Sequence, residues 1–243
     1  MSAIIFAGPT LPPRLRPDDR ELTWRPPVRQ GELYRAAREG SAIIGVVDGY
    51  FEVTPTVWHK EILWAMAAGV HVFGAASIGA LRAAELDRFG MRGVGRVYEG
   101  FRDGALEDDD EVAVLHGPEE LGYPLVTDAM VDIRATVEAA HREGVIGAAS
   151  AVALTEAAKA LFYKQRTYAA MLDRAEGIGD GERAAFAQWL PRGRVERKRL
   201  DAEAMIAAIR AEIGAGVASL RVSYTLAESA AWRAARRRAD GVT

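Results

Sequence analysis

The first third of the chain contains three short apolar runs without the alternation of a half-exposed strand. They cover residues 2–11 (SAIIFAGPTL), 41–51 (SAIIGVVDGYF) and 69–77 (GVHVFGAAS). Continuous apolar runs of this length predict strands that are covered on both faces. Amphipathic patterns over residues 31–38 and 56–68 lie between them and predict helices. Such an alternation of strands and helices is typical of a parallel α/β sheet.

From residue 126 onward the pattern changes to helices alone. Apolar residues recur there at the three- to four-residue spacing of a helix, and glycines mark the stops. Thr127 or Asp128 is the expected N-cap of the first helix, and the second segment could form one helix or two. The predicted helical segments cover residues 127–144, 148–177, 181–190 and 200–216.

Three other segments lack a clear period. Residues 12–29 are rich in proline and arginine and are predicted to form an irregular loop. Residues 90–100 (GMRGVGRVYEG) lack the glycine order of a phosphate-binding loop, so we interpret them as a loop with close backbone packing. Residues 230–243 (AAWRAARRRADGVT) are predicted to form a frayed basic tail.

These patterns predict an α/β fold with a parallel-strand core in the N-terminal half, followed by a mostly helical C-terminal half. We expect two regions. Residues 1–125 form the α/β core with the active site, and residues 126–243 form a helical region packed on that core.

Charge and hydropathy narrow the classes of partner. The formal net charge is −3, which favours neither a nucleic-acid partner nor an acidic membrane surface. No apolar run approaches the roughly 18 residues of a membrane span. The N-terminus lacks the basic stretch of a signal peptide and has the pattern of a strand. We therefore expect a cytoplasmic protein with no membrane partner.

Two residue types constrain the chemistry. Cysteine is absent, which excludes disulfides, a cysteine nucleophile and a thiolate metal site. The sequence shows no other metal or cofactor motif, so neither is expected. Lysine occurs only at positions 60, 159, 164 and 198, against 27 arginines. Because a general base must lose its proton and arginine cannot, the few lysines are candidate bases.

Candidate site residues follow the three predicted strands. Gly8 and Thr10 follow the first strand, Asp48 and Gly49 follow the second, and Ser77 follows the third. Because the carboxyl ends of parallel strands share one edge of a sheet, we expect these residues to lie close together.

Ser77 has two interpretations. The segment AASIG resembles the G-x-S-x-G nucleophile elbow, with Ala75 in place of the first glycine. In that interpretation the helix that follows directs the N–H groups of Ile78 and Gly79 at the reacting oxyanion. Alternatively, Ser77 only caps that helix, which is a very common role for serine.

A nucleophilic serine needs a base, and several residues are candidates. Lys60, if buried beside the serine, could lose its proton. His59 could act instead, with Asp48 orienting it in a conventional triad. Lys164 and Lys198 are rival bases. The plainer interpretation is that His59 and Lys60 belong to the solvated face of an amphipathic helix.

Two charged features complete the set of candidates. Arg82 and Glu85 lie one to two helical turns beyond Ser77, where they could form an ion pair or line the site. The acidic run of residues 107–111 (EDDDE) lacks the spacing of a calcium loop and is interpreted as a solvated turn.

Four segments, taken in order, resemble the TfuA-like core family. The ordered set is specific, although no single motif is. With FAGPTL before it and FYKQRTY after it, the likeness covers residues 3–168. The four segments are VVDGYFEVTPTVWHKEIL (46–63), GVHVFGAASIGALRAAEL (69–86), FGMRGVGRVYEGF (89–101) and DDDEVAVLHG (108–117).

The resemblance implies a function. TfuA-like proteins accompany YcaO enzymes, which use ATP to install thioamides in ribosomal precursor peptides or in proteins. The TfuA-like partner resembles a hydrolase that releases sulfide from a small ubiquitin-like sulfur carrier of the ThiS type, which bears a C-terminal thiocarboxylate. It is also expected to help YcaO engage its peptide. The acidic run of residues 107–111 then becomes a candidate docking surface.

The resemblance also implies site residues. The family's site is a serine–lysine pair, which maps onto Ser77 and Lys60. Backbone N–H groups at Ile78 and in the Gly8–Thr10 turn would then hold the oxyanion. Two rivals remain: a non-catalytic adaptor for YcaO and its peptide, in which Ser77 is only a cap, and a hydrolase of small molecules. The residues implied to bind substrate are Gly8, Thr10, Asp48, Gly49, His59, Ile78, Gly79 and Arg82.

Overall fold

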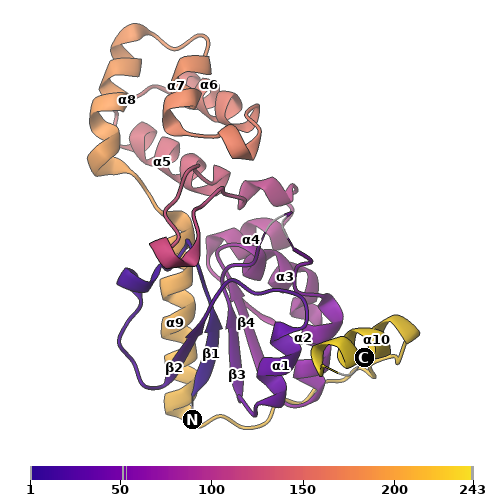
Figure 1. Ribbon diagram of the computed structural model, residues 1–243. Coiled ribbons are helices and arrows are strands. Elements are labelled where there is room, and N and C mark those ends of the chain that lie inside the picture. Colours follow the sequence, from indigo (N-terminus) through magenta and orange to yellow (C-terminus); the bar gives the residue numbers. More distant parts are fainter. Residues whose placement is uncertain (1, 51, 53, 242–243) are drawn as a thin grey trace. The chain divides into compact units, whose positions relative to one another are not determined.

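The computed structural model describes all residues except 1, 51, 53 and 242–243 (Figure 1). It divides into two compact units. The first contains Met1–Glu107 and Arg199–Thr243, and the second contains Asp108–Lys198. The predicted domain boundary at residue 125 stays a prediction, because compactness alone does not show that a segment folds independently.

The first unit is built on a five-stranded sheet in the order β2-β1-β3-β4-β5, and every pairing in it is parallel. The predicted parallel α/β core is therefore confirmed, and the three apolar runs are its three central strands. The strands are β1 (Ala3–Phe6), β2 (Leu22–Arg25), β3 (Ile43–Val46), β4 (His71–Ala75) and β5 (Arg92–Val94).

Helices cover both faces of this sheet (Figure 1). On one face, Ile4, Ile44 and Val72 pack against α1 (Glu32–Arg38), α2 (His59–Ala67) and α3 (Ile78–Leu86). On the other face, the alternate strand residues pack against a single long helix, α9 (Arg197–Ala215), through Met205, Ile206 and Ile209. Coverage on both faces explains why the central strands are continuous apolar runs.

Two predicted loops contain strands, so those two predictions were wrong. β2 lies within residues 12–29, and β5 lies within residues 90–100, where α4 (Arg96–Arg102) follows it. Both are edge strands of three or four residues and are mostly not buried. An edge strand this short has no continuous apolar run, so its pattern resembled that of a loop.

The predicted frayed tail is also wrong, because residues Ala230–Ala239 form helix α10. The Ser229 hydroxyl caps this helix by accepting a hydrogen bond from the backbone N–H of Trp232 at 3.2 Å. Trp232 is 1% exposed, and its ring contacts those of Tyr34 and Trp58. One buried tryptophan among arginines and alanines therefore anchors the C-terminal helix on the first unit.

The second unit is helical, as predicted, with a core that includes Met130, Leu154, Tyr168 and Phe186. The segment of residues 148–177 forms two helices rather than one. The α-helices of this unit are α5 (Met130–Arg142), α6 (Ala148–Lys159), α7 (Tyr168–Arg174) and α8 (Asp180–Gly193). Short 3-10 turns across the two units lie at Pro13–Leu15, Asp87–Phe89, Asp109–Glu111, Glu119–Leu121 and Tyr163–Gln165.

The expected N-cap of α5 is a further correction. The cap position is Ala129, and neither Thr127 nor Asp128 caps the helix. The Thr127 hydroxyl accepts from the Leu115 N–H at 2.7 Å, and the Asp128 carboxylate accepts from the Tyr168 N–H at 3.1 Å. Both side chains therefore hold distant segments of this unit together, which a local capping pattern cannot reveal.

Candidate functional site

Ser77 follows a tight turn between β4 and α3. Ala76 has a φ of +68°, which a residue with a side chain rarely adopts. The Ser77 N–H donates to the Ala75 carbonyl oxygen at 2.8 Å, so the turn closes over three residues. A γ-turn of this kind is rare and strained. Because such strain gathers at functional sites, the turn marks Ser77 as a candidate.

Small residues beside the turn allow helix and strands to approach closely. A Cβ on Gly79 would lie 1.8 Å from the Val46 carbonyl oxygen, and a Cβ on Gly74 would lie 2.1 Å from the Gly79 carbonyl oxygen. No side chain fits in either place, so both positions require glycine. This crowding is the physical reason for the small residues of the GAASIG segment.

The Ser77 hydroxyl is available for chemistry. Ser77 is 7% exposed and occupies the N-cap position of α3, but its side chain does not cap the helix. Among the described residues neither its hydroxyl nor the Ile78 N–H has a hydrogen-bond partner. The Gly79 N–H, in contrast, donates to the Val47 carbonyl oxygen at 3.3 Å. A hydroxyl beside a free N–H at the start of a helix can act as a nucleophile next to an oxyanion donor.

Asp48 holds the end of β3 to the turn that follows β1. Its Oδ2 accepts the N–H groups of Gly8 and Thr10 at 2.8 and 3.0 Å, and its Oδ1 accepts the Thr10 hydroxyl at 2.6 Å. The carboxylate is 2% exposed. Two hypotheses are therefore wrong in this structure. Asp48 does not orient His59, and the Gly8–Thr10 turn has no N–H left for an oxyanion, since Pro9 carries none.

The three strand ends converge as expected. Thr10 and Asp48 are hydrogen-bonded to each other. Gly49 lies against Ile78, because a Cβ on Gly49 would meet the Ile78 Cγ2 at 2.9 Å. The sheet edge therefore places the ends of β1, β3 and β4 in one neighbourhood, with Ser77 at its β4 side.

His59 is bound along α3 rather than beside Ser77. Its Nε2 lies 2.8 Å from Glu85 Oε2, which also accepts from Arg82 Nη1 at 2.7 Å. The expected Arg82–Glu85 ion pair is thus confirmed. Glu85 lies eight residues beyond Ser77, which is about 12 Å along a helix. Burial favours a higher pKa for Glu85, but its bonds to His59 and Arg82 lower that pKa below its ordinary value.

Arg82 connects two elements as well as binding Glu85. Its Nε donates to the Val57 carbonyl oxygen at 3.2 Å, just before α2 begins, and the side chain is 11% exposed. This position lets Arg82 hold the start of α2 against α3. A role for Arg82 in substrate binding stays a prediction.

Lys60 is the one lysine in the sequence of the first unit. Its Nζ donates to the Ala227 carbonyl oxygen in the segment that leads to α10. The structure therefore does not pair Lys60 with Ser77. The rival bases Lys164 and Lys198 belong to the second unit, where Lys198 is buried and its Nζ donates to the Val112 carbonyl oxygen at 2.8 Å.

The acidic run is only in part a solvated turn, because Glu107, Asp108 and Asp109 are exposed whereas Glu111 is buried. Glu111 accepts two bonds from Arg134, each 2.9 Å long, and Lys159 Nζ lies within 3.0 Å of Asp108, Asp110 and Glu111. Asp108, Asp110 and Glu111 are therefore bound within the second unit, and a docking role for the run stays a prediction.

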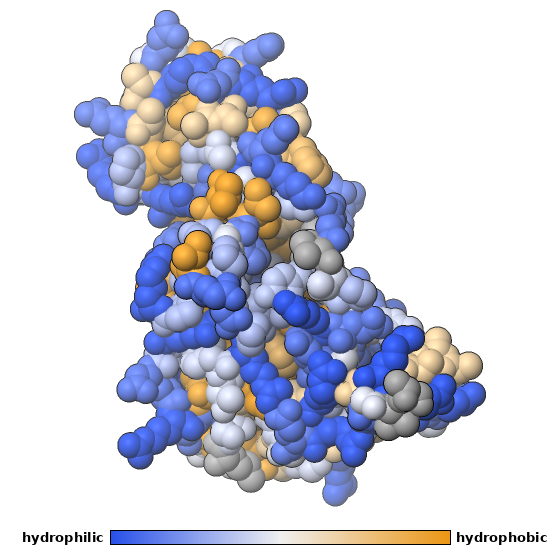
Figure 2. All heavy atoms as spheres, viewed as in Figure 1, coloured by the Kyte–Doolittle hydropathy of each residue, from blue (hydrophilic) through white to orange (hydrophobic). Residues whose placement is uncertain are grey.

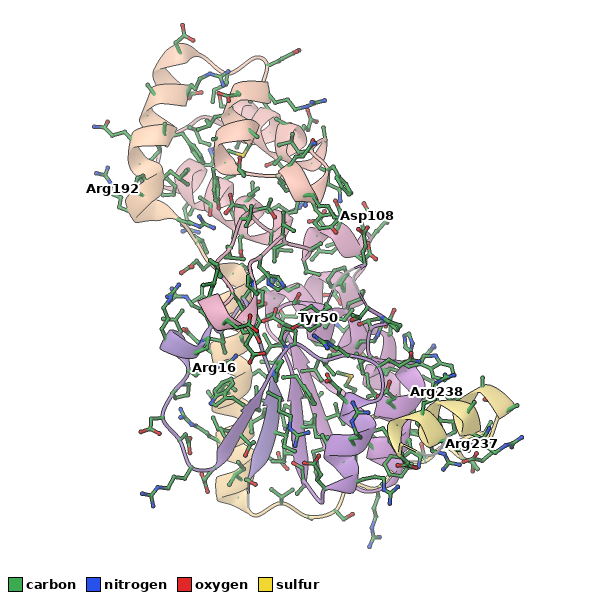
Figure 3. All side chains as sticks on the ribbon, viewed as in Figure 1. Arg16, Tyr50, Asp108, Arg192, Arg237 and Arg238 are labelled. Carbon is green, nitrogen blue, oxygen red and sulfur yellow. The ribbon has the colours of Figure 1, made fainter. Side chains whose placement is uncertain are left out.

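Two residues near the strand ends were missed by the sequence analysis. Arg16, which is labelled in Figure 3, donates to the carbonyl oxygens of Ala7 and Leu11 and so braces the turn after β1. Arg29 stacks over the Tyr50 ring at 4.5 Å. Both arginines come from the segment interpreted as a loop. The only available signal was its arginine content, which does not specify a partner.

The fold and this strand edge define an α/β protein with a serine at a strained strand-to-helix turn. The model of the TfuA-like protein family matches residues 48–167, which include Ser77. This part of the chain therefore belongs to the TfuA-like family, and the resemblance is confirmed. No curated protein matches the chain. Within the described residues, every helix is too short or too polar to cross a lipid bilayer.

Proposed function

We propose that this protein is the TfuA-like partner of a YcaO enzyme in backbone thioamidation. In this role it hydrolyses a thiocarboxylated carrier of the ThiS type, releases sulfide and aids the engagement of YcaO with its peptide or protein substrate. Family membership supports a role beside YcaO. The observation that carries the catalytic part is the free Ser77 hydroxyl, presented by a strained turn beside the free Ile78 N–H.

The proposed reaction has two steps. Ser77 Oγ attacks the thiocarboxylate carbon, its proton passes to the base, and the C–S bond breaks to release sulfide. The Ile78 N–H stabilises the negative oxygen that forms in between. Water then cleaves the acyl-serine, which leaves a carboxylate on the carrier and returns the proton to Ser77. Across both steps, thiocarboxylate and water give carboxylate and hydrogen sulfide.

We propose Lys60 as the base. It is the only lysine of the unit that contains Ser77, and arginine cannot replace a lysine that must lose its proton. In this assignment, the bond from Lys60 to the Ala227 carbonyl oxygen breaks before the reaction. A substrate that displaces the C-terminal segment from Lys60 would provide the trigger.

The adaptor remains the second candidate, and one observation favours it. Among the described residues no base contacts the Ser77 hydroxyl, so the catalytic pair is not assembled in the isolated chain. If the protein is only an adaptor, Ser77→Ala would leave thioamidation by YcaO intact.

The deciding experiment mixes the purified protein with a thiocarboxylated ThiS-type carrier. Mass spectrometry follows the carrier, and a sulfide assay follows the product. We expect Ser77→Ala to reduce the rate about a thousandfold or more. Lys60→Ala and Lys60→Arg should both reduce it strongly, whereas the matched neighbour His59→Ala should stay within about twofold of the wild type.

Each contrary result has a distinct meaning. A fully active Ser77→Ala variant would end the hydrolase proposal and leave the adaptor. A fully active Lys60→Arg variant would remove Lys60 as the base and keep Ser77. Turnover of simple esters without any need for the carrier would indicate a small-molecule hydrolase. Circular dichroism of each variant controls for loss of fold.

A further inference from the structure

A pocket of about 240 Å³ lies between α1 and α10 in the first unit. It involves none of the residues placed around Ser77. Its volume suits a few heavy atoms rather than a drug-sized ligand. Its polar lining side chains come from three helices and from the residues just before α1, and they are Gln30, Tyr34, Arg35, Glu61, Trp232, Arg236 and Arg238.

The pocket is rich in cationic donors. Arg35, Arg236 and Arg238 all line it. Arg236 is paired with Glu228 at 3.0 Å, and Arg35 Nη1 makes a long hydrogen bond of 3.5 Å to the Ala239 carbonyl oxygen. The Arg238 guanidinium has no ion-pair partner in the part of the chain that the structure describes. Three guanidinium groups around so small a space favour an anion with several acceptor oxygens.

A buried tryptophan also lines the pocket. Trp232 is 1% exposed, and its indole N–H is covered by neighbouring side chains and has no acceptor among the described residues. Its indole signal therefore reports on the pocket, but the N–H is not counted among the donors to a bound group.

The one carboxyl group in the lining does not oppose this interpretation. Both oxygens of Glu61 are already engaged, with Gly31 N–H at 2.7 Å on one side and Trp58 N–H at 3.1 Å on the other. Burial also raises the pKa of Glu61, which favours its neutral form. Glu228 compensates the charge of Arg236, which leaves Arg35 and Arg238 against at most one carboxylate in the lining, so the pocket is net positive.

We propose that this pocket binds a small oxyanion, a carboxylate or phosphate group, through the guanidinium groups of Arg238 on α10 and Arg35 on α1. The bound group would bridge α10 to α1 and so hold the C-terminal helix in place. In Figure 2 the surface over α10 mixes strongly hydrophilic with weakly hydrophobic residues, as expected for an arginine- and alanine-rich wall.

The helix supplies a matched control. Trp232, Ala235, Arg238 and Ala239 share one helical face, at the spacing of three, four and seven residues. Arg237 immediately precedes Arg238 in the sequence, is exposed like Arg238, and does not line the pocket (Figure 3). Arg237→Ala removes the same charge as Arg238→Ala. Comparing the two variants therefore separates binding in the pocket from a general attraction of anions to the positively charged helix.

The test follows the indole N–H signals of the five tryptophans by NMR while an anion is added to the full chain at constant ionic strength. Inorganic phosphate and acetyl-diglycine serve as probes for a phosphate and a carboxylate source. We expect one indole signal, the one missing in Trp232→Phe, to shift saturably with at least one probe. Arg238→Ala should weaken binding about tenfold, and Arg237→Ala less than twofold.

Two outcomes would overturn the proposal. The Trp232 signal could stay unmoved by both anions, or the two arginine variants could weaken binding equally. If Trp232→Phe does not fold, calorimetric titration of the two arginine variants decides alone. The probe that binds more tightly identifies the source of the anion. None of these measurements involves a sulfur carrier. The result for this pocket is therefore independent of the result for the proposed reaction at Ser77.

Discussion

Arg166 in the second unit and Ser77 in the first are both buried polar side chains, but their surroundings differ. Arg166 is fully buried and donates to the carbonyl oxygens of Ala158, Leu161 and Asp110 as well as to the Asp110 carboxylate. The Ser77 hydroxyl has no partner among the described residues and follows a strained turn. A complete set of partners contributes to stability, whereas a free group held in a strained place is available for chemistry.

The largest expected effect comes from removing the fully partnered side chain. Arg166→Ala leaves Asp110 without one of its two cationic partners and three backbone acceptors without a donor. We expect the free energy of unfolding to fall by about 3–5 kcal/mol, measured by chemical denaturation. Arg142→Ala, an exposed position in the same unit, should change it by less than about 0.5 kcal/mol. Equal effects would show that the Arg166 bonds do not stabilise the unit.

An intermediate effect concerns pH. Asp132 is buried, and burial raises its pKa to about 6, although its bond to the Lys198 N–H acts in the opposite direction. The native state therefore keeps a proton that the unfolded state releases, so this group's contribution to stability falls as pH rises from about 4 to about 6 and is constant above.

Asp132→Asn should remove that trend. Relative to wild type, the variant should gain up to about 3 kcal/mol of unfolding free energy between pH 4 and pH 7. Denaturation curves across this range measure the difference, and the exposed Asp173→Asn should show no trend. A stability difference that stays constant with pH would mean that Asp132 is not protonated in the native state.

The smallest effect tests the turn itself. Ala76 and Ala80 are both fully buried, but only Ala76 has a positive φ. Ala76→Gly should change the free energy of unfolding by less than about 1 kcal/mol, because relief of strain offsets the lost methyl burial. Ala80→Gly, within α3, should lose about 2 kcal/mol. Thermal denaturation measures both losses of unfolding free energy. Equal losses in the two variants would show that the turn is not strained, and the contrast between Ser77 and Arg166 would then rest on hydrogen bonding alone.

Much of the fold was predictable because the spacing of apolar residues along the chain indicates which positions are buried. The three central strands, α1, α2 and the helices of the second unit all follow from apolar periodicity. The edge strands β2 and β5 did not, because short and partly exposed strands have no continuous apolar run. Helix α10 was missed because a single residue, Trp232, supplies its buried anchor.

The candidate site was predictable in one respect. The small residues around Ser77 predicted a tight turn between strand and helix. The contacts that require Gly79 to be a glycine come from Val46 of β3 and Gly74 of β4. The partners of the other candidates were not predictable. Asp48 accepts hydrogen bonds from Gly8 and Thr10 and does not contact His59. The sequence pattern allowed either partner for Asp48.

By itself, the sequence determined the class of fold, the place of Ser77 at the end of a buried strand and the match of residues 48–167 to the TfuA-like family. Periodicity and small-residue spacing carry this information, because they act between neighbours in the chain. Only the tertiary structure decided which polar groups are engaged. His59 binds Glu85 across 26 residues, and Lys60 binds Ala227 across 167. Such bonds depend on which distant segments the packed core brings into reach, and no local pattern encodes that.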